Sequence, residues 1–388
     1  MRPLVDFLRT ESSSGILLLL ATVVALVWAN SAWSSSYAGF LGRTVVDGIG
    51  VHLDVHEFVN DALMAVFFFV VGLEISRELV RGELRAPRAA ALPVLAAIGG
   101  MVVPALIYVA FNAGGAGSRG WGIPMATDIA FAVGVLVLFG RRVPTSLKLF
   151  LLALAVVDDL GAIIVIAVFY SGSVALAWLA AAIIGLGALV ALRRTRAFPW
   201  ALAVLGVLVW YCVLRSGVHA TIAGVALAFI VPVDRGIMLN ERLHPWSARL
   251  IVPVFALCNA GIVLGSEAVH DAVSSPVTHG VVLGLVAGKT LGVFVAAVVA
   301  IALGIAVRPQ GASNLHLLAV AIVAGIGFTV SLFITGLAFD DPLLQNDAKI
   351  GILIASIVAA LGAAVVMAIA QRAAPRSPEE GVDGPVST

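Results

Sequence analysis

The sequence has few charged residues and very few cysteines, and each scarcity excludes a class of protein. Only 12% of its 388 residues are charged and its formal net charge is +1, which provides no strong attraction for nucleic acid or an acidic macromolecule. We therefore expect no nucleic-acid partner. The two cysteines, Cys212 and Cys258, form neither a spaced metal motif nor a disulfide framework. We interpret them as packing residues and expect no cofactor.

Apolar residues are abundant instead. They make up 61% of the chain and give a mean hydropathy of +1.10, far from the average of soluble domains. They fall in long runs, and about 20 helical residues cross a hydrocarbon core roughly 30 Å thick. The sequence predicts an all-α integral membrane protein with twelve spans. The predicted spans are 15–30, 59–84, 90–112, 121–140, 148–170, 174–192, 200–214, 217–233, 248–265, 280–307, 316–338 and 347–371.

The N-terminal run follows Arg2 and Arg9, as the apolar part of a signal peptide also would. We favour an uncleaved first span, because a multi-span protein inserts without cleavage. Residues 1–14 are then an N-terminal segment and 15–371 a single twelve-helix domain. The end of the chain, 372–388, is rich in Pro, Glu, Gly and Ser, a composition that predicts a disordered tail.

The basic residues indicate how the spans are oriented. If the N-terminus is cytoplasmic, 18 of the 23 Lys and Arg residues lie at inner span ends, four lie outside, and Lys289 lies within a span. This asymmetry follows the positive-inside rule and predicts that both termini are cytoplasmic. The loop 31–58 is then external. Within it, β-branched residues around Asp47-Gly48 predict a hairpin over 44–53.

The predicted topology contains two groups of three spans with opposite orientations, the third to fifth and the tenth to twelfth. The middle span of each group contains helix-breaking or small polar residues: Pro124, Thr127 and Asp128 in the fourth, and Gly325, Gly327, Thr329 and Ser331 in the eleventh. Paired interruptions in inverted repeats indicate an ion site near the membrane midplane. Ordinary Gly and Ser positions in helix packing are the alternative.

Four charged residues lie deep within the predicted spans: Asp128, Asp158, Asp159 and Lys289. Each costs about 2.5–3.5 kcal/mol at the bilayer centre, so together they oppose insertion by roughly 10 kcal/mol. A rise of about 1.5 Å per residue places Asp158 and Lys289 roughly 15 Å inside their spans, near the midplane. We interpret the four as a functional centre rather than a structural polar cluster.

The adjacent residues Asp158 and Asp159 point about 100° apart on a helix, so we expect different roles for them. One can face a water-filled cavity and bind a hard cation through oxygen, while the other pairs with a buried amine. The candidate amine is Lys289, one of three lysines beside twenty arginines. A desolvated lysine can lose its proton, whereas an arginine stays charged. Its depth disfavours snorkelling to an interface.

Five segments closely resemble the NhaA family of bacterial sodium/proton antiporters, and the similarity extends to about Gly362. The segments are HEFVNDALMAVFFFVVGLEISREL at 56–79, ATDIAFAVGVL at 126–136, LALAVVDDLGAIIVIAVFY at 152–170, SGVHATIAG at 216–224 and GIGFTVSLFI at 325–334. The resemblance implies a multi-pass protein of the bacterial inner membrane. It also implies twelve spans, of which the fourth and eleventh are broken and cross each other.

The resemblance implies electrogenic export of Na⁺ or Li⁺ in exchange for protons by alternating access. Asp159 would be the principal sodium and proton site, and Asp158 its partner, paired with Lys289. Thr127 and Asp128 would lie at the helix crossing. There Asp128 would compensate positive helix ends and Lys289 negative ones.

The resemblance further implies pH regulation through Glu74, Arg77 and Glu78 on the cytoplasmic side, with His219 as another pH-linked position. The residues alone fit two simpler interpretations equally well. The first three form an interfacial salt-bridge cluster, and a histidine at a helix start is often only hydrogen-bonded.

Two further implications concern regulation and assembly. The short segment Asp234–His244 departs from the family pattern, with Asn240 and Glu241 where an acidic residue followed by histidine is expected. The pH setting of the family therefore does not transfer directly to this chain. The external hairpin of the family pairs two subunits, so residues 44–53 predict a homodimer.

Two other functions could also use buried acidic residues. An intramembrane aspartyl protease would need YD and GxGD motifs on separate helices, which the sequence lacks, and adjacent aspartates on one helix are poorly placed to share a proton. We therefore expect no enzyme activity. A passive cation channel lined by acidic residues is the remaining alternative.

Overall fold

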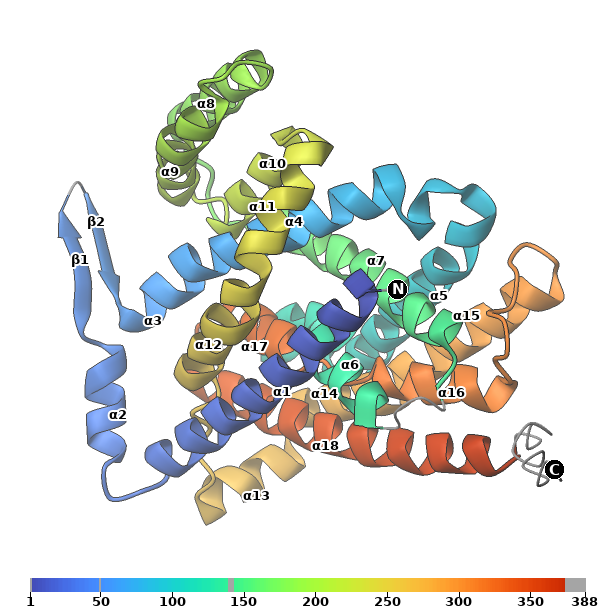
Figure 1. The fold of residues 1–388 in the computed structure, drawn as a ribbon. Helices are drawn as coiled ribbons and strands as arrows, with labels where there is room; N and C mark the ends of the chain where they lie inside the picture. The colour runs from blue at the N-terminus through green and yellow to red at the C-terminus, as the bar shows by residue number, and fades with distance from the viewer. Residues whose placement is uncertain (1, 49, 139–142, 374–388) are drawn as a thin grey trace, which may run out of the picture.

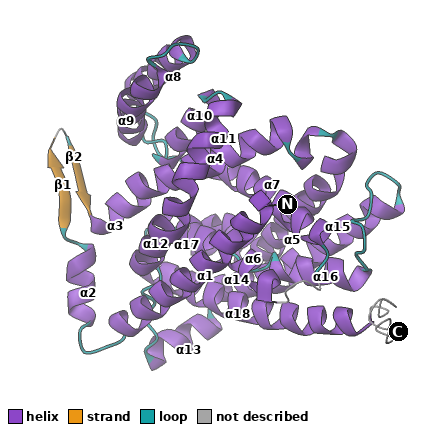
Figure 2. Cartoon of the chain, in the orientation of Figure 1, coloured by secondary structure: helices purple, strands orange, loops and turns teal. Residues whose placement is uncertain are grey.

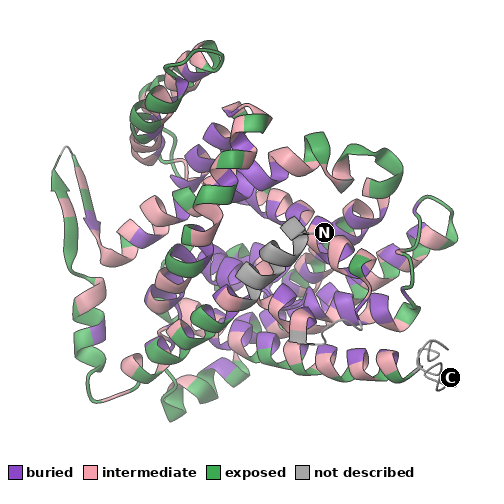
Figure 3. Ribbon diagram, in the orientation of Figure 1, coloured by how far each residue is buried: buried purple, intermediate pink, exposed green. Residues whose placement is uncertain are grey.

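The computed structural model describes residues 2–48, 50–138 and 143–373. This part of the chain is almost entirely helical, with one two-stranded sheet (Figures 1 and 2). Figure 3 shows buried residues concentrated on the central helices, whereas the helices over 176–216 at the top of the view have few buried residues. The predicted disordered tail lies outside the described residues from 374 onwards.

The described residues contain six helices that are long and apolar enough to cross a bilayer, or nine if each of three bent pairs forms one span. The six are Val55–Arg81, Pro87–Asn112, Thr145–Phe169, Phe198–Ser216, Pro276–Ala302 and Pro342–Arg372. The bent pairs are Ser13–Ala29 with Ser34–Leu41, Ala116–Met125 with Ile129–Val137, and Asn314–Val323 with Phe328–Ala338. The expected membrane-type helical fold is confirmed, while twelve spans stay a prediction.

Several helices lie close to their predicted limits. They are α5 (Pro87–Asn112), α7 (Thr145–Phe169), α8 (Leu176–Leu192), α9 (Phe198–Ser216) and α18 (Pro342–Ala373). The first helix is longer than predicted, because α1 (Arg2–Ala29) includes residues expected to precede it. The helices that the prediction did not include are α2 (Ser34–Leu41), α11 (Val233–Trp246) and α13 (Ser266–Ser274). The end of the second predicted span is the separate 3₁₀ turn η2 (Glu83–Arg85), and α10 (Thr221–Ile230) is shorter than its predicted span.

The second span begins at residue 55 instead of 59, because a capping box starts it there. The Glu57 amide donates to Asp54 Oδ1 over 2.7 Å, and the Asp54 amide donates to Glu57 Oε2 over 3.1 Å. The helix continues in three parts: α3 (Val55–Phe58), the π-helical turn η1 (Val59–Leu63) and α4 (Met64–Arg81).

The ninth predicted span ends six residues early. It consists of the π-helical turn η5 (Ser247–Ile251) and α12 (Val252–Asn259). Beyond it, side-chain amides replace helical hydrogen bonds, because the Leu264 amide donates to Asn30 Oδ1 over 2.7 Å and the Val263 amide to Asn346 Oδ1 over 3.0 Å. The tenth span comprises α14 (Pro276–Leu283), the π-helical turn η6 (Gly284–Lys289) and α15 (Thr290–Ala302).

The fourth and eleventh predicted spans are broken where their sequences predict interruptions. The fourth consists of the 3₁₀ helix η3 (Ala116–Met125) and α6 (Ile129–Leu138), and the eleventh of α16 (Asn314–Val323) and α17 (Phe328–Ala338). Each pair is bent by 43°. The two breaks meet, because the Asp128 amide donates to the Ile326 carbonyl over 2.7 Å. The interruptions therefore form one shared centre.

The predicted hairpin is confirmed, but its turn is displaced. Strands β1 (Thr44–Gly48) and β2 (Val51–Asp54) pair antiparallel and project at the left of Figure 1. Asp47 pairs with His52 and Gly48 with Val51, so this dipeptide belongs to the strand. Gly50 follows with φ +72°, a left-handed conformation that favours glycine. The turn therefore falls two residues later than predicted.

Candidate functional site

The break in the fourth span places one carboxylate at the start of two helices. Asp128 is 2% exposed, and its Oδ1 accepts a hydrogen bond from the Phe131 amide of α6 over 3.1 Å. Its Oδ2 accepts from the amide and hydroxyl of Thr329 in α17 over 3.0 and 2.6 Å. A negative charge therefore faces the positive ends of α6 and α17, where it stabilises unpaired amides. This is the position predicted for Asp128.

The buried amine of Lys289 lies at a negative helix end. Lys289 is 0% exposed, its ammonium donates to the Met125 carbonyl at the end of η3, and Nζ lies 2.5 Å from Asp158 Oδ2. The predicted contact between Asp158 and Lys289 is thus present. Thr127 Oγ1 lies 2.6 Å from the same carboxylate oxygen and 2.9 Å from the Ala324 carbonyl oxygen. One oxygen of Asp158 is therefore held by two groups.

Asp159, the next residue of α7, has a different environment. It is 5% exposed, and its carboxylate has no hydrogen-bond or ion-pair partner among the residues that the structure describes. It lines a cavity of about 60 Å³, whereas Asp158 does not. Asp158 Oδ1 is buried and likewise lacks a hydrogen-bond partner in the described chain. The structure thus separates a fixed carboxylate from an available one.

The cavity wall is contributed by α4, the fourth-span break, α6, α7, α11, η5, α12 and α17. Its polar residues are Glu74, Thr127, Asp128, Asp159, His244, Ser247 and Thr329, and its apolar residues are Phe67, Val70, Val71, Ile129, Ala130, Ala248, Val252 and Val330. About 10–15 Å³ of such volume holds one water molecule. The cavity therefore has room for a small cation with several waters.

Only one of the three residues predicted to sense pH near α4 lies in the cavity wall. Glu74 is 7% exposed, and its Oε1 lies 3.6 Å from His244 Nε2. Arg77 Nη2 instead lies 3.2 Å from Glu78 Oε1, in a partly exposed ion pair. The expected salt-bridge cluster is thus present in part, and it is distinct from the contact that faces the cavity.

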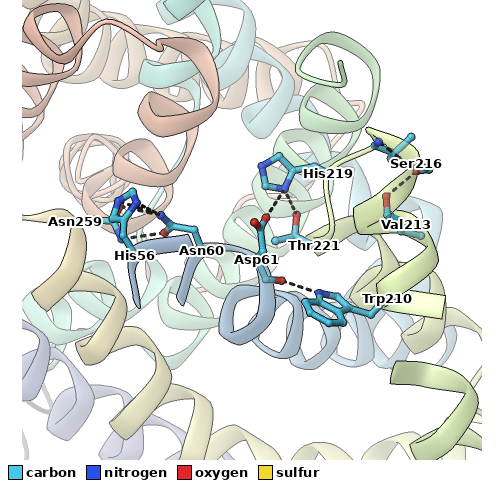
Figure 4. A network of polar contacts seen from close by, with 10 residues as sticks. His56, Asn60, Asp61, Trp210, Val213, Ser216, His219, Thr221 and Asn259 are labelled. Carbon is cyan, nitrogen blue, oxygen red and sulfur yellow. Dashed lines mark hydrogen bonds and ion pairs between the residues drawn. The ribbon is translucent and has the colours of Figure 1, made fainter. Parts of the chain in front are cut away.

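His219 lies outside the cavity wall, in a separate polar network (Figure 4). Its Nδ1 is 3.9 Å from Asp61 Oδ1 and 3.5 Å from Thr221 Oγ1. Trp210 Nε1 donates to the Asp61 carbonyl over 2.9 Å. Sequence reasoning did not single out Asp61, although an aspartate at the third position of a predicted span was an available signal.

A second polar cluster lies beside it in Figure 4. His56 Nε2 is 3.1 Å from Asn259 Oδ1, and Asn259 Nδ2 donates to Asn60 Oδ1 over 3.0 Å. Asn60 and Asp61 are neighbours in η1 and face the two clusters. A π-helical turn often marks a functional position, and this one connects the second span to α12 and to the start of α10.

Comparison with known proteins gives a consistent result over nearly the whole chain. A family model described as Na⁺/H⁺ antiporter 1 matches residues 5–367. The chain is 48% identical over 372 residues to the Na(+)/H(+) antiporter NhaA of Shewanella sp. (strain ANA-3), covering 92% of this chain and 95% of that protein. It is 46% identical over 394 residues to the Na(+)/H(+) antiporter NhaA 2 of Erythrobacter litoralis (strain HTCC2594), covering 98% of this chain and 97% of the relative.

Proposed function

The chain belongs to the Na⁺/H⁺ antiporter 1 family, and from this membership we propose that it exports Na⁺ or Li⁺ in exchange for protons by alternating access. Members of this family are transporters rather than enzymes. The proposed cycle is electrogenic, because each exported ion is exchanged for a larger number of protons. Every net charge moved is worth about 2.3 kcal/mol per 100 mV of membrane potential.

The observation that carries this proposal is the unequal environment of the two adjacent carboxylates. Asp159 faces the cavity without a partner among the described residues, while Asp158 contacts Lys289 and Thr127. We assign Asp159 as the principal site for Na⁺ and H⁺. Asp158 contributes Oδ1, its oxygen without a hydrogen bond. Hard cations bind to oxygen ligands of this kind.

Competition at one carboxylate explains how the two ions are coupled. A protonated carboxylate is a poor ligand for Na⁺, and a carboxylate that holds Na⁺ resists protonation. The empty site carries an unpaired negative charge that is costly to bury. We propose that only the protein with Na⁺ or H⁺ bound changes between inward- and outward-open states. The empty protein then stays in one state, and no ion leaks across the membrane.

The broken helices support alternating access around a fixed site. We propose twelve spans in which the third to fifth and the tenth to twelfth form inverted repeats. The supporting observations are the two bends of 43° and the contact between the two breaks. Asp128 at two positive helix ends and Lys289 at a negative end match the electrostatics of discontinuous membrane helices.

We place the protein in the bacterial inner membrane with both termini cytoplasmic. The distribution of Lys and Arg supports this orientation. Glu74 and His244 then lie on the cytoplasmic side of the cavity, and the hairpin lies outside. The tip of the hairpin is held by Arg215, whose guanidinium donates to the Gly50 carbonyl. We propose that the hairpin over 44–53, positioned by this contact, pairs two subunits in a homodimer.

Regulation by pH is proposed at two places. Glu74 and His244 face each other at the cavity, with the Arg77–Glu78 ion pair nearby in the sequence. His219 faces Asp61 outside the cavity wall. Each contact pairs a histidine with a carboxylate, so protonation of the histidine would change the charge at that contact.

Vesicles that contain the purified protein test the proposed exchange. A sodium pulse outside should drive protons out of the vesicle, and an equal pulse of choline chloride should not. A potential set by a potassium gradient should change the rate, because the cycle moves net charge. Proton movement indifferent to sodium would refute exchange. Sodium entry without any counter-movement of protons would support the passive channel instead.

A further inference from the structure

A group of aromatic rings lies beside the cavity and is centred on Phe333 of α17. Its ring contacts those of Phe68 in α4, His219 before α10 and Phe255 in α12, with centroid distances of 5.5, 5.4 and 6.1 Å. These separations and the tilted or edge-on angles are favourable for aromatic pairs. Phe68 and Phe333 are 2% exposed and Phe255 is 0% exposed. The rings therefore pack together from four segments that are distant in the sequence.

The ring group lies one helical turn from the cavity. Each phenylalanine is three residues from a valine of the cavity wall: Phe68 from Val71, Phe255 from Val252, and Phe333 from Val330. Residues three apart share a helix face and are separated by about 4.5 Å along its axis. Along α4 the displacement points away from Glu74, and along α12 it points away from η5. All three rings therefore lie on the side opposite the Glu74–His244 contact.

The polar network drawn in Figure 4 includes residues further along the same two spans than Phe68 and Phe255. Asn259 follows Phe255 by four residues, and Asp61 precedes Phe68 by seven, which correspond to about one and two further helical turns. His219 belongs to both layers, because its ring contacts Phe333 while its Nδ1 lies 3.9 Å from Asp61 Oδ1. The order from the centre outward is cavity, aromatic rings and polar network.

From this order we infer that Phe333, held by Phe68, Phe255 and His219, is the outer gate of the exchange site. The inference rests on the proposed function and its membrane orientation. In this structure the rings separate the outer polar network from Asp159, so an ion reaches the outside only when Phe333 leaves its position. Phe333 shares α17 with Thr329, which binds Asp128. Both residues move with α17. A movement of α17 relative to α4 and α12 therefore opens the outer path and shifts the helix crossing at the same time.

Cysteine labelling tests the gate. Cys212 and Cys258 are replaced by alanine, and Val330→Cys in the cavity wall serves as the reporter. Intact cells receive a membrane-impermeant maleimide without added sodium, and the modified fraction is measured by mass spectrometry. Phe333→Ala should raise the external labelling rate at least fivefold. It should also produce a sodium-independent proton leak in vesicles, because the cavity then lacks its outer closure.

Phe328→Ala is the matched control. Phe328 lies in the same helix, is also 2% exposed, and packs against Phe131 at 5.4 Å instead of against the ring group. It should leave both external labelling and the proton leak at the level of the parent protein. Phe333→Leu keeps most of the apolar volume and should give an intermediate increase in both. This second variant decides the question if Phe333→Ala does not fold.

The outcomes separate the gate from the proposed function. Folded Phe333 variants that label and leak like Phe328→Ala would overturn the gate, even if sodium-driven proton movement persists in the parent protein. Absence of sodium-driven proton movement in the unmodified protein would instead refute the exchange function. The labelling experiment does not depend on ion exchange. Its result can therefore show that the gate is wrong independently of whether the exchange function is right.

Discussion

The two halves of the charged centre are built in opposite ways. At the helix crossing, Asp128, Asp158 and Lys289 are bound to helix ends or to each other. One residue further along α7, Asp159 lies in the cavity wall with no partner in the described chain. Bound charges hold a structure together, whereas a free carboxylate in a small cavity is available to an exchanging ion. The difference between the two regions therefore predicts different mutant phenotypes.

The sharpest loss of stability is expected from Lys289→Ala. This change leaves Asp158 buried without its cation, which costs about 3–5 kcal/mol in comparable buried pairs. Thermal unfolding in detergent should show a large decrease in midpoint. Replacing both partners, as in Lys289→Met with Asp158→Leu, should recover much of the loss without restoring exchange. A single variant as stable as the parent would contradict the structural role of the pair.

Asp128→Ala should have the next largest effect. It removes three hydrogen bonds at the starts of α6 and α17, and we expect a loss of about 2–3 kcal/mol. Asp128→Asn keeps one acceptor oxygen and should lose less. Equal unfolding midpoints for the two variants would show that the carboxylate is not needed at these helix ends.

Thr127→Val tests whether a hydroxyl at the helix crossing also affects Na⁺ binding. Its hydroxyl lies beside Asp158 Oδ2, so its removal should cost about 1 kcal/mol and weaken the apparent affinity for Na⁺. Thr335→Val is the control, because that buried hydroxyl donates to the Ser331 carbonyl of its own helix over 2.8 Å. Both variants should lose similar stability, but only the first should change sodium affinity. A matching affinity change in both would remove Thr127 from the site.

His244→Gln should have the smallest effect, confined to acidic pH. Protonated His244 places a positive charge 3.6 Å from Glu74 at the cavity, which reduces the attraction of the cavity for cations. A neutral glutamine cannot gain this charge, so the variant should bind Na⁺ more tightly than the parent in acidic solution and equally in alkaline solution. His270→Gln in the exposed helix α13 is the control. An equal change at both pH values would contradict a charge effect.

Much of this contrast could be anticipated from the sequence. Long apolar runs predicted the helices, and the interruptions near Asp128 and Thr329 predicted both breaks. The 100° rotation between neighbouring helical residues predicted separate roles for Asp158 and Asp159. These signals are local, because they depend on hydropathy, helix breakers and helical geometry.

Other features depend on contacts between distant segments and had no local signal. The cavity wall includes His244, which enters from a helix that hydropathy did not predict. Helix α12 ends at Asn259 because Asn30 and Asn346 supply distant hydrogen-bond partners. The aromatic group around Phe333 joins four segments, and its three phenylalanines look like ordinary apolar residues in the sequence.

The central claim is that Asp159 is the carboxylate that exchanges ions, and sodium-dependent proton release across pH tests it most directly. Unmodified protein, Asp159→Asn and the control Asp271→Asn, at an exposed position of α13, are compared in vesicles after their folding is verified. We predict that the unmodified protein and the control release protons on sodium addition, and that Asp159→Asn releases none at any pH. Full sodium-dependent release by Asp159→Asn would contradict the account.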